Sequence, residues 1–396
     1  MLTRPTPFAS LRPAAEDRWI ETAEALAEPF RATVAADDVS GELPLEHLRA
    51  ISASGLDVAF LPVEHGGEAL SYATLAQVVR IFAAAHPAVA AVWLMHIGAA
   101  HALVTMSAPP AAEHFAAALR AGDRFSNALS EPAGGNHFLS SQQDVGAVEG
   151  GWSLTGSKLF VSGVEAADHV FLNVRIDGVP GFFGLDRDDT MSLPPIEQTI
   201  GMRATRSRTI DFDGTLLPAD RRCGPPPATY ANLITIGFAA LSIGIAESAI
   251  DALVATATRR KHPAAERLAD SSWVKQETAM VWAELGAARL VAERTAWLAD
   301  QRDPVAMAAA TEGKMLTNEV AKKAAALALK VGGGGAYLAR SPIQRIFRDA
   351  QAGALMAYSV PFSQEVVGEW VLAEPVAQAP SAQAPIVQAP VPAPAA

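Results

Sequence analysis

The sequence predicts an α+β protein with an N-terminal helical domain, a middle β-barrel or β-sandwich domain and a C-terminal helical bundle. Three observations predict this architecture. Alanine and leucine are dense toward both ends of the chain, stretches of alternating apolar and polar residues lie between them, and half of the 396 residues are apolar. A chain of this length and composition can bury a sizeable core in two to three domains.

The N-terminal helical domain is expected over residues 1–122. From about residue 14 onward, glycine and proline occur mainly where turns are expected, at 62–67 and 108–110. Long segments rich in alanine and leucine between such breaks favour helices.

The middle β domain is expected over residues 123–225. The Gly-Gly pair within 148–152 can adopt the positive φ angles of a tight turn, which predicts a hairpin. Apolar residues alternate along 170–178 and the run ends in Asp-Gly, which predicts a strand followed by a turn. A similar alternation along 210–214 also ends in Asp-Gly and predicts a second strand and turn.

The C-terminal bundle is expected over residues 226–372. Within it, an apolar stripe at helical spacing predicts one face of a long core helix: Val281, Leu285, Ala288 and Ala292. Residues 373–396 form a Pro- and Ala-rich segment in which proline recurs every five residues. Such spacing prevents a helix, so we expect a disordered, fairly extended tail.

Composition excludes several classes of function. A net charge of −11 argues against a nucleic-acid surface, and the only cysteine, Cys223, forms neither an internal disulfide nor a cysteine-rich zinc site. The histidines lack the paired spacing of metal ligands, so no metal site is predicted. The start of the chain lacks the apolar core of a secretory signal, and the longest apolar run, 234–246, is too short to cross a bilayer. We therefore expect a soluble cytoplasmic protein with no membrane contact.

Five motifs occur along the chain in a specific order: Asn127–Asn136 (NALSEPAGGN), Trp152–Gly163 (WSLTGSKLFVSG), Gly201–Thr205 (GMRAT), Gly332–Tyr337 (GGGGAY) and Arg348–Ala350 (RDA). Together they resemble the acyl-CoA dehydrogenase superfamily, and the resemblance extends from about residue 15 to 372. It implies that superfamily's fold and a bound flavin, which requires a flat slot with hydrogen bonds at its edges.

The resemblance implies that Leu129, Ser130, Phe160 and Ser162 line the isoalloxazine slot. Relatives usually have Trp and Thr at the last two of these positions, and here Phe keeps a stacking face while Ser keeps a hydroxyl. The alternative interpretation is that Phe160 and Leu129 belong to the ordinary core of the β domain.

The dinucleotide is expected to reach a second set of residues. Gly333 and Gly334 match backbone that approaches the dinucleotide of a neighbouring subunit, although a plain helix–helix turn would also explain them. Arg260, or its neighbour Arg259, and Gln276 fall near the positions that hold the pyrophosphate and adenine in relatives. The resemblance therefore implies FAD, or alternatively FMN or a reduced flavin supplied by a reductase, and a homodimer or homotetramer.

The carboxylate base of acyl-CoA dehydrogenation is missing at the usual positions. That reaction needs a base near the substrate α-carbon. The two positions that carry Glu in relatives correspond to Ala357 and, in a minority of the family, to about Ile234. Ordinary dehydrogenation by the usual base is therefore disfavoured.

The sequence is also similar to the two-component flavin monooxygenase branch, which includes dibenzothiophene oxygenases and needs no such base. Many of those enzymes carry a His where this chain has Met356. His96, on an apolar helical segment, is the candidate for orienting or protonating an oxygen adduct, with His137 as a weaker candidate. The opposing interpretation is that His96 is a satisfied core residue.

Other polar residues near the flavin motifs have structural explanations. Glu131 is interpreted as fixing its loop, whereas Glu165, Asp168 and His169 form either a polar cluster or a solvated strand end. Cys223 is interpreted as a structural thiol.

We therefore predict a flavin-dependent oxidoreductase that oxygenates a small or carrier-bound substrate through a flavin C4a-hydroperoxide, with a flavin reductase as possible partner. The first alternative is an FAD-dependent acyl-thioester dehydrogenase with a relocated base. The second is a non-catalytic subunit that partners a catalytic paralogue.

Overall fold

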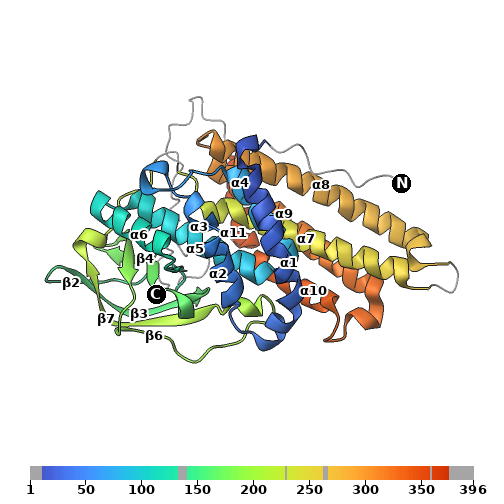
Figure 1. Cartoon of the computed structure of the whole chain (residues 1–396), viewed down its shortest axis with the longest axis horizontal. Helices are drawn as coiled ribbons and strands as arrows, with labels where there is room; N and C mark the ends of the chain where they lie inside the picture. The colour runs from blue at the N-terminus through green and yellow to red at the C-terminus, as the bar shows by residue number, and fades with distance from the viewer. Residues whose placement is uncertain (1–10, 133–140, 228–229, 262–265, 357–358, 374–396) are drawn as a thin grey trace, which may run out of the picture.

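The computed structural model describes residues 11–132, 141–227, 230–261, 266–356 and 359–373. Helices fill both ends of this chain, and a smaller β region lies between them in sequence and at one end of the molecule in space (Figure 1). This arrangement confirms the predicted fold class.

The N-terminal part is helical, as its alanine- and leucine-rich segments predict. Its elements are η1 (Ala14–Glu16), α1 (Asp17–Ser40), α2 (Leu45–Ala53), α3 (Leu56–Ala59), η2 (Val63–His65), α4 (Tyr72–Ala85), α5 (Pro87–Met106) and α6 (Pro109–Ala121). The expected break at 62–67 contains η2. Gly66 caps the end of η2, and its φ of +85° suits glycine. Gly122, which also has a positive φ, ends α6 just before the first strand.

The middle part contains two small sheets. Its elements are β1 (Phe125–Ala128), β2 (Gly146–Val148), β3 (Gly151–Val161), η3 (Val164–Ala166), β4 (His169–Ile176), β5 (Val179–Asp186), β6 (Met191–Ser192), η4 (Arg203–Thr205), β7 (Arg208–Pro218) and η5 (Ala219–Arg221). The strand orders are β1-β4-β5 and β2-β3-β7-β6, and β1 runs parallel to β4. Apolar side chains of both sheets form one shared core, as in a sandwich.

The local predictions in this domain have different outcomes. The predicted hairpin within 148–152 joins β2 to β3, and the predicted strand and Asp-Gly turn within 170–178 form β4 and the connection to β5. The turn predicted at Asp213-Gly214 is wrong, because β7 continues through both residues. The register shifts there against β3, and Gly214 has a φ of +65°, which is the geometry of a β-bulge.

The C-terminal part is a helical bundle. Its elements are α7 (Leu233–Arg259), η6 (Leu268–Asp270), α8 (Ser272–Asp300), α9 (Ala306–Ala336), α10 (Pro342–Leu355) and α11 (Val360–Leu372). On α8, Leu285, Ala288 and Ala292 are buried, as the predicted stripe requires. The predicted tail over 373–396 lies outside the described residues beyond Ala373.

Two helices, α5 and α7, are long and apolar enough to cross a membrane by length and composition. The helix α7 extends well beyond the apolar run 234–246, so the prediction that this segment is too short to span a bilayer does not hold for the whole helix. In the most apolar windows of α5 and α7, however, 83% and 89% of the residues are buried inside the protein. Both helices are therefore placed as core helices of this fold.

Close helix packing in this core depends on glycine. A Cβ atom added at Gly244 of α7 would lie 2.5 Å from the backbone oxygen of Arg80 and 2.6 Å from Cβ of Ala83, both on α4. At Gly98 of α5, the added atom would lie 2.3 Å from Cγ1 of Ile234 on α7. These distances are too short for any real carbon atom, so the glycines allow the helices to approach each other.

We therefore predict that Gly244→Ala destabilises the protein by about 1–3 kcal/mol, because the added methyl group overpacks the contact between α4 and α7. Gly286→Ala on α8 is the matched control, since nothing lies within 4 Å of its added Cβ. Better helix propensity should make that variant more stable by up to about 1 kcal/mol. Thermal unfolding followed by circular dichroism measures both changes, and equal midpoints for the two variants would contradict the packing argument.

Candidate functional site

The structure brings together the four candidate flavin-slot residues of the middle domain. The amide of Leu159 on β3 donates a hydrogen bond to the backbone oxygen of Ser130 at 2.8 Å, which links the segment after β1 to the end of β3. Leu129 and Ser130 on one segment therefore lie beside Phe160 and Ser162 on the other. This backbone hydrogen bond holds the two segments side by side.

Phe160 is not part of the β-domain core. Its side chain is 68% exposed and its φ is +56°, a backbone conformation that few residues other than glycine adopt. An exposed aromatic ring on a strained backbone is typical of functional positions. Leu129 is half-buried and packs against an apolar cluster formed mainly by the N-terminal helices, not against the shared core of the two sheets.

Ser162 supplies a buried hydroxyl two residues further along the chain. Its Oγ lies 2.8 Å from Oγ of Ser207, whose Oγ in turn lies 2.8 Å from Oγ1 of Thr205. Its backbone oxygen accepts a hydrogen bond from Ser126 of β1 at 3.2 Å. The serine is therefore fixed from both sides.

A buried ion pair holds the two segments in place. The ammonium of Lys158 on β3 is fully buried and donates to the Glu131 carboxylate, to the backbone oxygen of Asn173 at 2.6 Å and to its Oδ1 at 3.0 Å. Glu131 also accepts hydrogen bonds from the Ser141 hydroxyl and from the amide of Gln142. Glu131 thus has a structural role, because it ties the segment after β1 to Lys158, Ser141 and Gln142.

The residues expected to reach the dinucleotide form a second group. This group lies at the opposite end of the molecule, where α7 ends and α8 begins (Figure 1). Arg260 donates through Nη1 to the backbone oxygens of Val331 and Gly332 on α9, at 3.2 and 3.1 Å. Arg259 instead donates to Ala255 of its own helix. The structure therefore distinguishes the two arginines, because only Arg260 contacts the glycine-rich segment.

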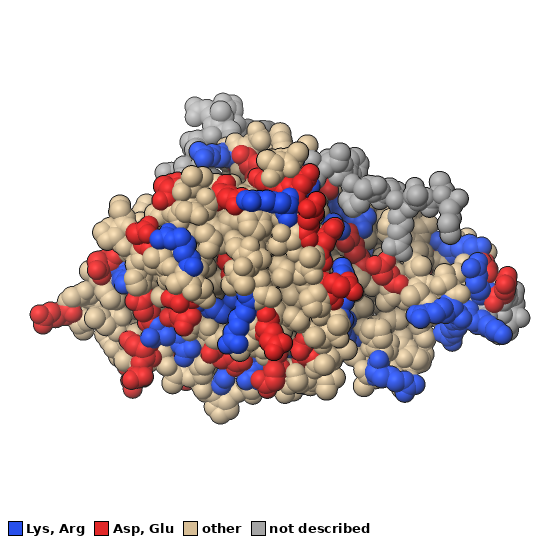
Figure 2. Space-filling model, viewed as in Figure 1, with Lys and Arg blue, Asp and Glu red and all other residues tan. Residues whose placement is uncertain are grey.

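Gly333 interrupts α9 with φ +58° and ψ −152°, a conformation essentially restricted to glycine. A Cβ atom there would lie 3.1 Å from Nη1 of Arg260. Gly334 is exposed one residue further on, and Gln276 is exposed on the first turns of α8. Lys and Arg side chains gather on the surface at this end of the molecule (Figure 2).

His96 requires a correction, because the structure leaves neither of its ring nitrogens available for catalysis. It is fully buried on α5, Nδ1 accepts from the amide of Phe125 at 3.0 Å, and Nε2 donates to Asp57 at 3.2 Å. Burial and the charge of Arg124 lower the pKa of His96, against the opposing effect of Asp57. His96 is therefore a neutral, satisfied core histidine, which was the opposing interpretation.

The described carboxylates next to the flavin motifs are all engaged elsewhere. Glu165 pairs with Arg206 and Arg208, at distances of 2.9 and 3.3 Å, and Asp168 accepts from the amide of Arg124. His169 instead contacts other carboxylates, so Glu165, Asp168 and His169 do not form one cluster. Cys223 is buried, and burial raises the pKa of its thiol to about 11, as expected for a structural cysteine.

Both positions at which relatives carry the base lack a carboxylate. One of them, Ile234, is buried in the first turn of α7. Met356, at the position where many of the monooxygenases carry a His, follows the end of α10. Ala357 and His137 lie outside the described residues.

Lys314 on α9 is a fully buried lysine that no sequence pattern indicates. Its ammonium donates to the backbone oxygen of Gly353 in the last turn of α10, which also accepts from the side chain of Asn318 at 2.8 Å. Burial lowers the pKa of Lys314 to about 7. Helical spacing places Lys314 on an ordinary helix face, so nothing in the sequence distinguishes it from a surface lysine.

Several known proteins are similar to this chain in sequence. The family described as "Acyl-CoA dehydrogenase, C-terminal domain" matches residues 232–357. A probable acyl-CoA dehydrogenase fadE25 of Mycobacterium leprae is 26% identical over 352 residues, which cover 83% of this chain and 88% of that protein. Dibenzothiophene monooxygenase of Rhodococcus qingshengii is 27% identical over 272 residues, covering 61% and 62% of the two chains.

Two solved structures share the fold. Butyryl-CoA dehydrogenase from Megasphaera elsdenii superposes with a TM-score of 0.85 at 20% identity, covering 91% of this chain and 99% of that one. FMN-bound TdsC from Paenibacillus sp. A11-2 has a TM-score of 0.80 at 21% identity, covering 90% and 97%. The helix–sandwich–helix architecture is thus that of acyl-CoA dehydrogenases. The chain therefore resembles the acyl-CoA dehydrogenase superfamily in its sequence and shares its fold.

We predict that Lys158→Met destabilises the protein by about 3–5 kcal/mol, because it leaves the Glu131 carboxylate buried without its cation. Lys323→Met is the matched control, since Lys323 forms an ion pair with Glu284 at the surface. That variant should change stability by less than about 1 kcal/mol. Denaturant unfolding measures the difference, and adding Glu131→Gln to Lys158→Met should restore part of the loss. Equal stability of the two lysine variants would show that the buried pair is not structurally important.

Proposed function

We propose that this protein is a flavin-dependent oxidoreductase that oxygenates a small or carrier-bound substrate, and that it binds FAD, or alternatively FMN or a reduced flavin from a reductase. Similarity to the superfamily supports the flavin-dependent oxidoreductase class. The choice of oxygenation over dehydrogenation rests on this chain's own residues.

The middle domain offers groups that fit a flavin ring. The exposed ring of Phe160 provides an apolar stacking face, and Ser162, two residues further along the chain, carries a hydroxyl. On β1, the Nδ2 group of Asn127 donates to Met95, whereas its Oδ1 is buried with no partner among the described residues. An unsatisfied buried acceptor two residues before Leu129 suits an N–H donor of a ligand. The flavin would supply the redox chemistry, and these residues would bind and orient it.

The second group would bind the phosphates of a dinucleotide. Arg259, Arg260 and Lys261 are exposed where α7 ends, and Arg260 contacts the glycine-rich turn, so cationic side chains and accessible backbone occur together. Because the two groups lie at opposite ends of one chain, we propose that a complete dinucleotide site uses both groups from different subunits. This proposal favours a homodimer or homotetramer.

The single observation that favours oxygenation is the lack of an available base. Ile234 and Ala357 occupy the positions of the usual carboxylates, and Glu131 and Glu165 are both held in ion pairs. Removal of a substrate α-proton therefore has no evident acceptor among the described residues near these motifs. Oxygenation needs no such acceptor, and the similarity to dibenzothiophene monooxygenase supports it.

Two alternatives remain testable. An acyl-thioester dehydrogenase with a relocated base is supported by the similarity to fadE25. A non-catalytic partner of a paralogue would lack flavin binding altogether. A cytoplasmic location and small-molecule or thioester substrates are part of the same proposal.

The function is tested with the full-length protein and reduced FAD or FMN prepared without oxygen. If the protein oxygenates, mixing with oxygen should give slower reoxidation of bound flavin than of free flavin, and acyl thioesters should not bleach the oxidised complex anaerobically. Bleaching by acyl thioesters would assign dehydrogenation instead. Failure to bind either flavin in both redox states would support the non-catalytic subunit.

We also predict that Arg260→Gln weakens FAD binding about tenfold or more, because it removes a charge-assisted contact to the pyrophosphate. FMN binding should change little, since FMN lacks the second phosphate and the adenosine. Arg259→Gln is the matched control, because it removes the same charge from the neighbouring residue. Titration followed by flavin fluorescence measures all four affinities. Equal weakening by both variants would indicate general electrostatics rather than a specific contact.

A further inference from the structure

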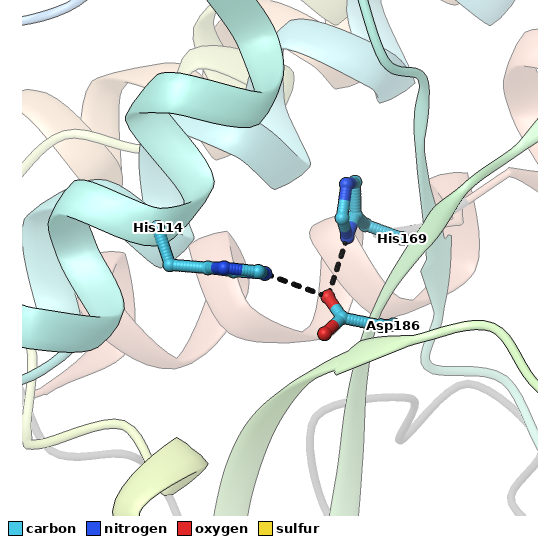
Figure 3. A group of neighbouring side chains, drawn as sticks. All are labelled: His114, His169 and Asp186. Atoms are coloured by element: carbon cyan, nitrogen blue, oxygen red, sulfur yellow. Dashed lines mark hydrogen bonds and ion pairs between the residues drawn. The ribbon is translucent and has the colours of Figure 1, made fainter.

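A cluster of two histidines and one carboxylate lies where α6 meets β4 and β5, away from the residues assigned to flavin. His114 on α6, His169 at the start of β4 and Asp186 at the end of β5 point toward one another (Figure 3). The ligand atoms His114 Nε2, His169 Nδ1 and Asp186 Oδ1 all lie within 4.8 Å of one another. Both imidazoles contact the same carboxylate oxygen, each at 2.8 Å.

We propose that His114, His169 and Asp186 form a binding site for a divalent transition metal of the Zn²⁺ class. Two imidazole nitrogens and one carboxylate oxygen are a common donor set for such metals, whereas Mg²⁺ and Ca²⁺ prefer oxygen ligands alone. Zinc binds nitrogen and oxygen ligands at about 2.0–2.2 Å, so tetrahedral ligand atoms lie about 3.4 Å apart. Small side-chain rotations that open the two 2.8 Å contacts would admit the ion.

The surroundings of His169 support this proposal independently. Its other nitrogen, Nε2, lies 3.2 Å from the Asp123 carboxylate. Metal-binding histidines usually donate their second N–H to a carboxylate or carbonyl, which fixes the tautomer and the ring orientation. The ring is buried and stacks on Phe125 with centroids 4.6 Å apart, so its position is set before any ion binds.

The second carboxylate oxygen and the local charge are also consistent with a cation. Oδ2 of Asp186 lies 3.4 Å from Nη2 of Arg221, which leaves Oδ1 directed at the histidines. The contacts of the cluster include two carboxylates, those of Asp123 and Asp186, and one guanidinium, that of Arg221. With neutral histidines the cluster therefore carries a net negative charge, which a divalent cation would compensate.

The remaining coordination positions would be filled from solvent. The side chains of His114 and Asp186 are 39% and 49% exposed, whereas that of His169 is 7% exposed. An ion here would link the last helix of the N-terminal domain to the sheet of the middle domain. The site would thus join two domains that also contact through apolar side chains such as Phe115 and Phe125.

The proposal differs from the expectation that the chain has no metal site. That expectation rests on the spacing of histidines in the sequence, which detects only ligands on one helix or hairpin. Here each ligand comes from a different element, so the spacing carries no signal.

The test is calorimetric titration of ZnCl₂ into the full-length protein after treatment with a chelator. We expect one Zn²⁺ per chain with micromolar or tighter affinity, and a rise in the thermal midpoint when Zn²⁺ is present. His114→Gln, at an exposed position, should weaken binding at least about tenfold and abolish the shift in midpoint. Asp123→Asn should weaken binding by about 10–100-fold through His169.

His65→Gln is the matched control, because His65 also contacts a carboxylate, that of Glu113, but with no second histidine. It should leave Zn²⁺ binding unchanged. Titration with Co²⁺ gives an independent measure, since its visible absorption reports nitrogen and oxygen ligands and should disappear in His114→Gln. No binding at millimolar Zn²⁺, or binding that His114→Gln and His65→Gln affect equally, would overturn the proposal.

Discussion

The buried charge of Lys158 is the constraint on which the middle domain depends. A buried ammonium must be paired, because an isolated charge in the interior costs several kcal/mol. Lys158 lies on β3, and its partners belong to the other sheet: Glu131 follows β1, and Asn173 lies on β4. One side chain thereby joins the two sheets and places the segment after β1 against the end of β3.

The candidate flavin slot is a consequence of that pairing. Glu131 follows Ser130 on one segment, and Lys158 precedes Leu159 on the other. The ion pair between Glu131 and Lys158 therefore holds Ser130 and Leu159 close enough to form their backbone bridge. Phe160 is then left facing outward on a strained backbone. The interior provides the rigidity, and the exposed ring provides the surface that a ligand can use.

The N-terminal helices support the same domain through a second polar network. Asp57 accepts hydrogen bonds from Trp93 and His96 of α5, and His96 accepts one from the amide of Phe125 at the start of β1. His96 thus connects the helical domain to the sheet. His96 therefore has a structural role, because both nitrogens of its ring have partners within the protein.

The sequence alone determined the order of the domains and much of the local structure. Alternating residues and an Asp-Gly turn predicted β4 and its connection to β5, and helical spacing predicted the buried face of α8, because these signals depend only on neighbouring residues. The resemblance of short motifs was enough to indicate Arg260 and the glycine-rich segment, which the structure brings into contact at Gly332. Only the tertiary structure decided that the Asp213-Gly214 pair is a bulge, since pairing with β3 overrides the local turn preference. It also decided that Phe160 is exposed, that His96 is fully satisfied, and that His114, His169 and Asp186 meet. Each of these depends on contacts between residues far apart in the chain, which packing fixes and residue spacing does not record.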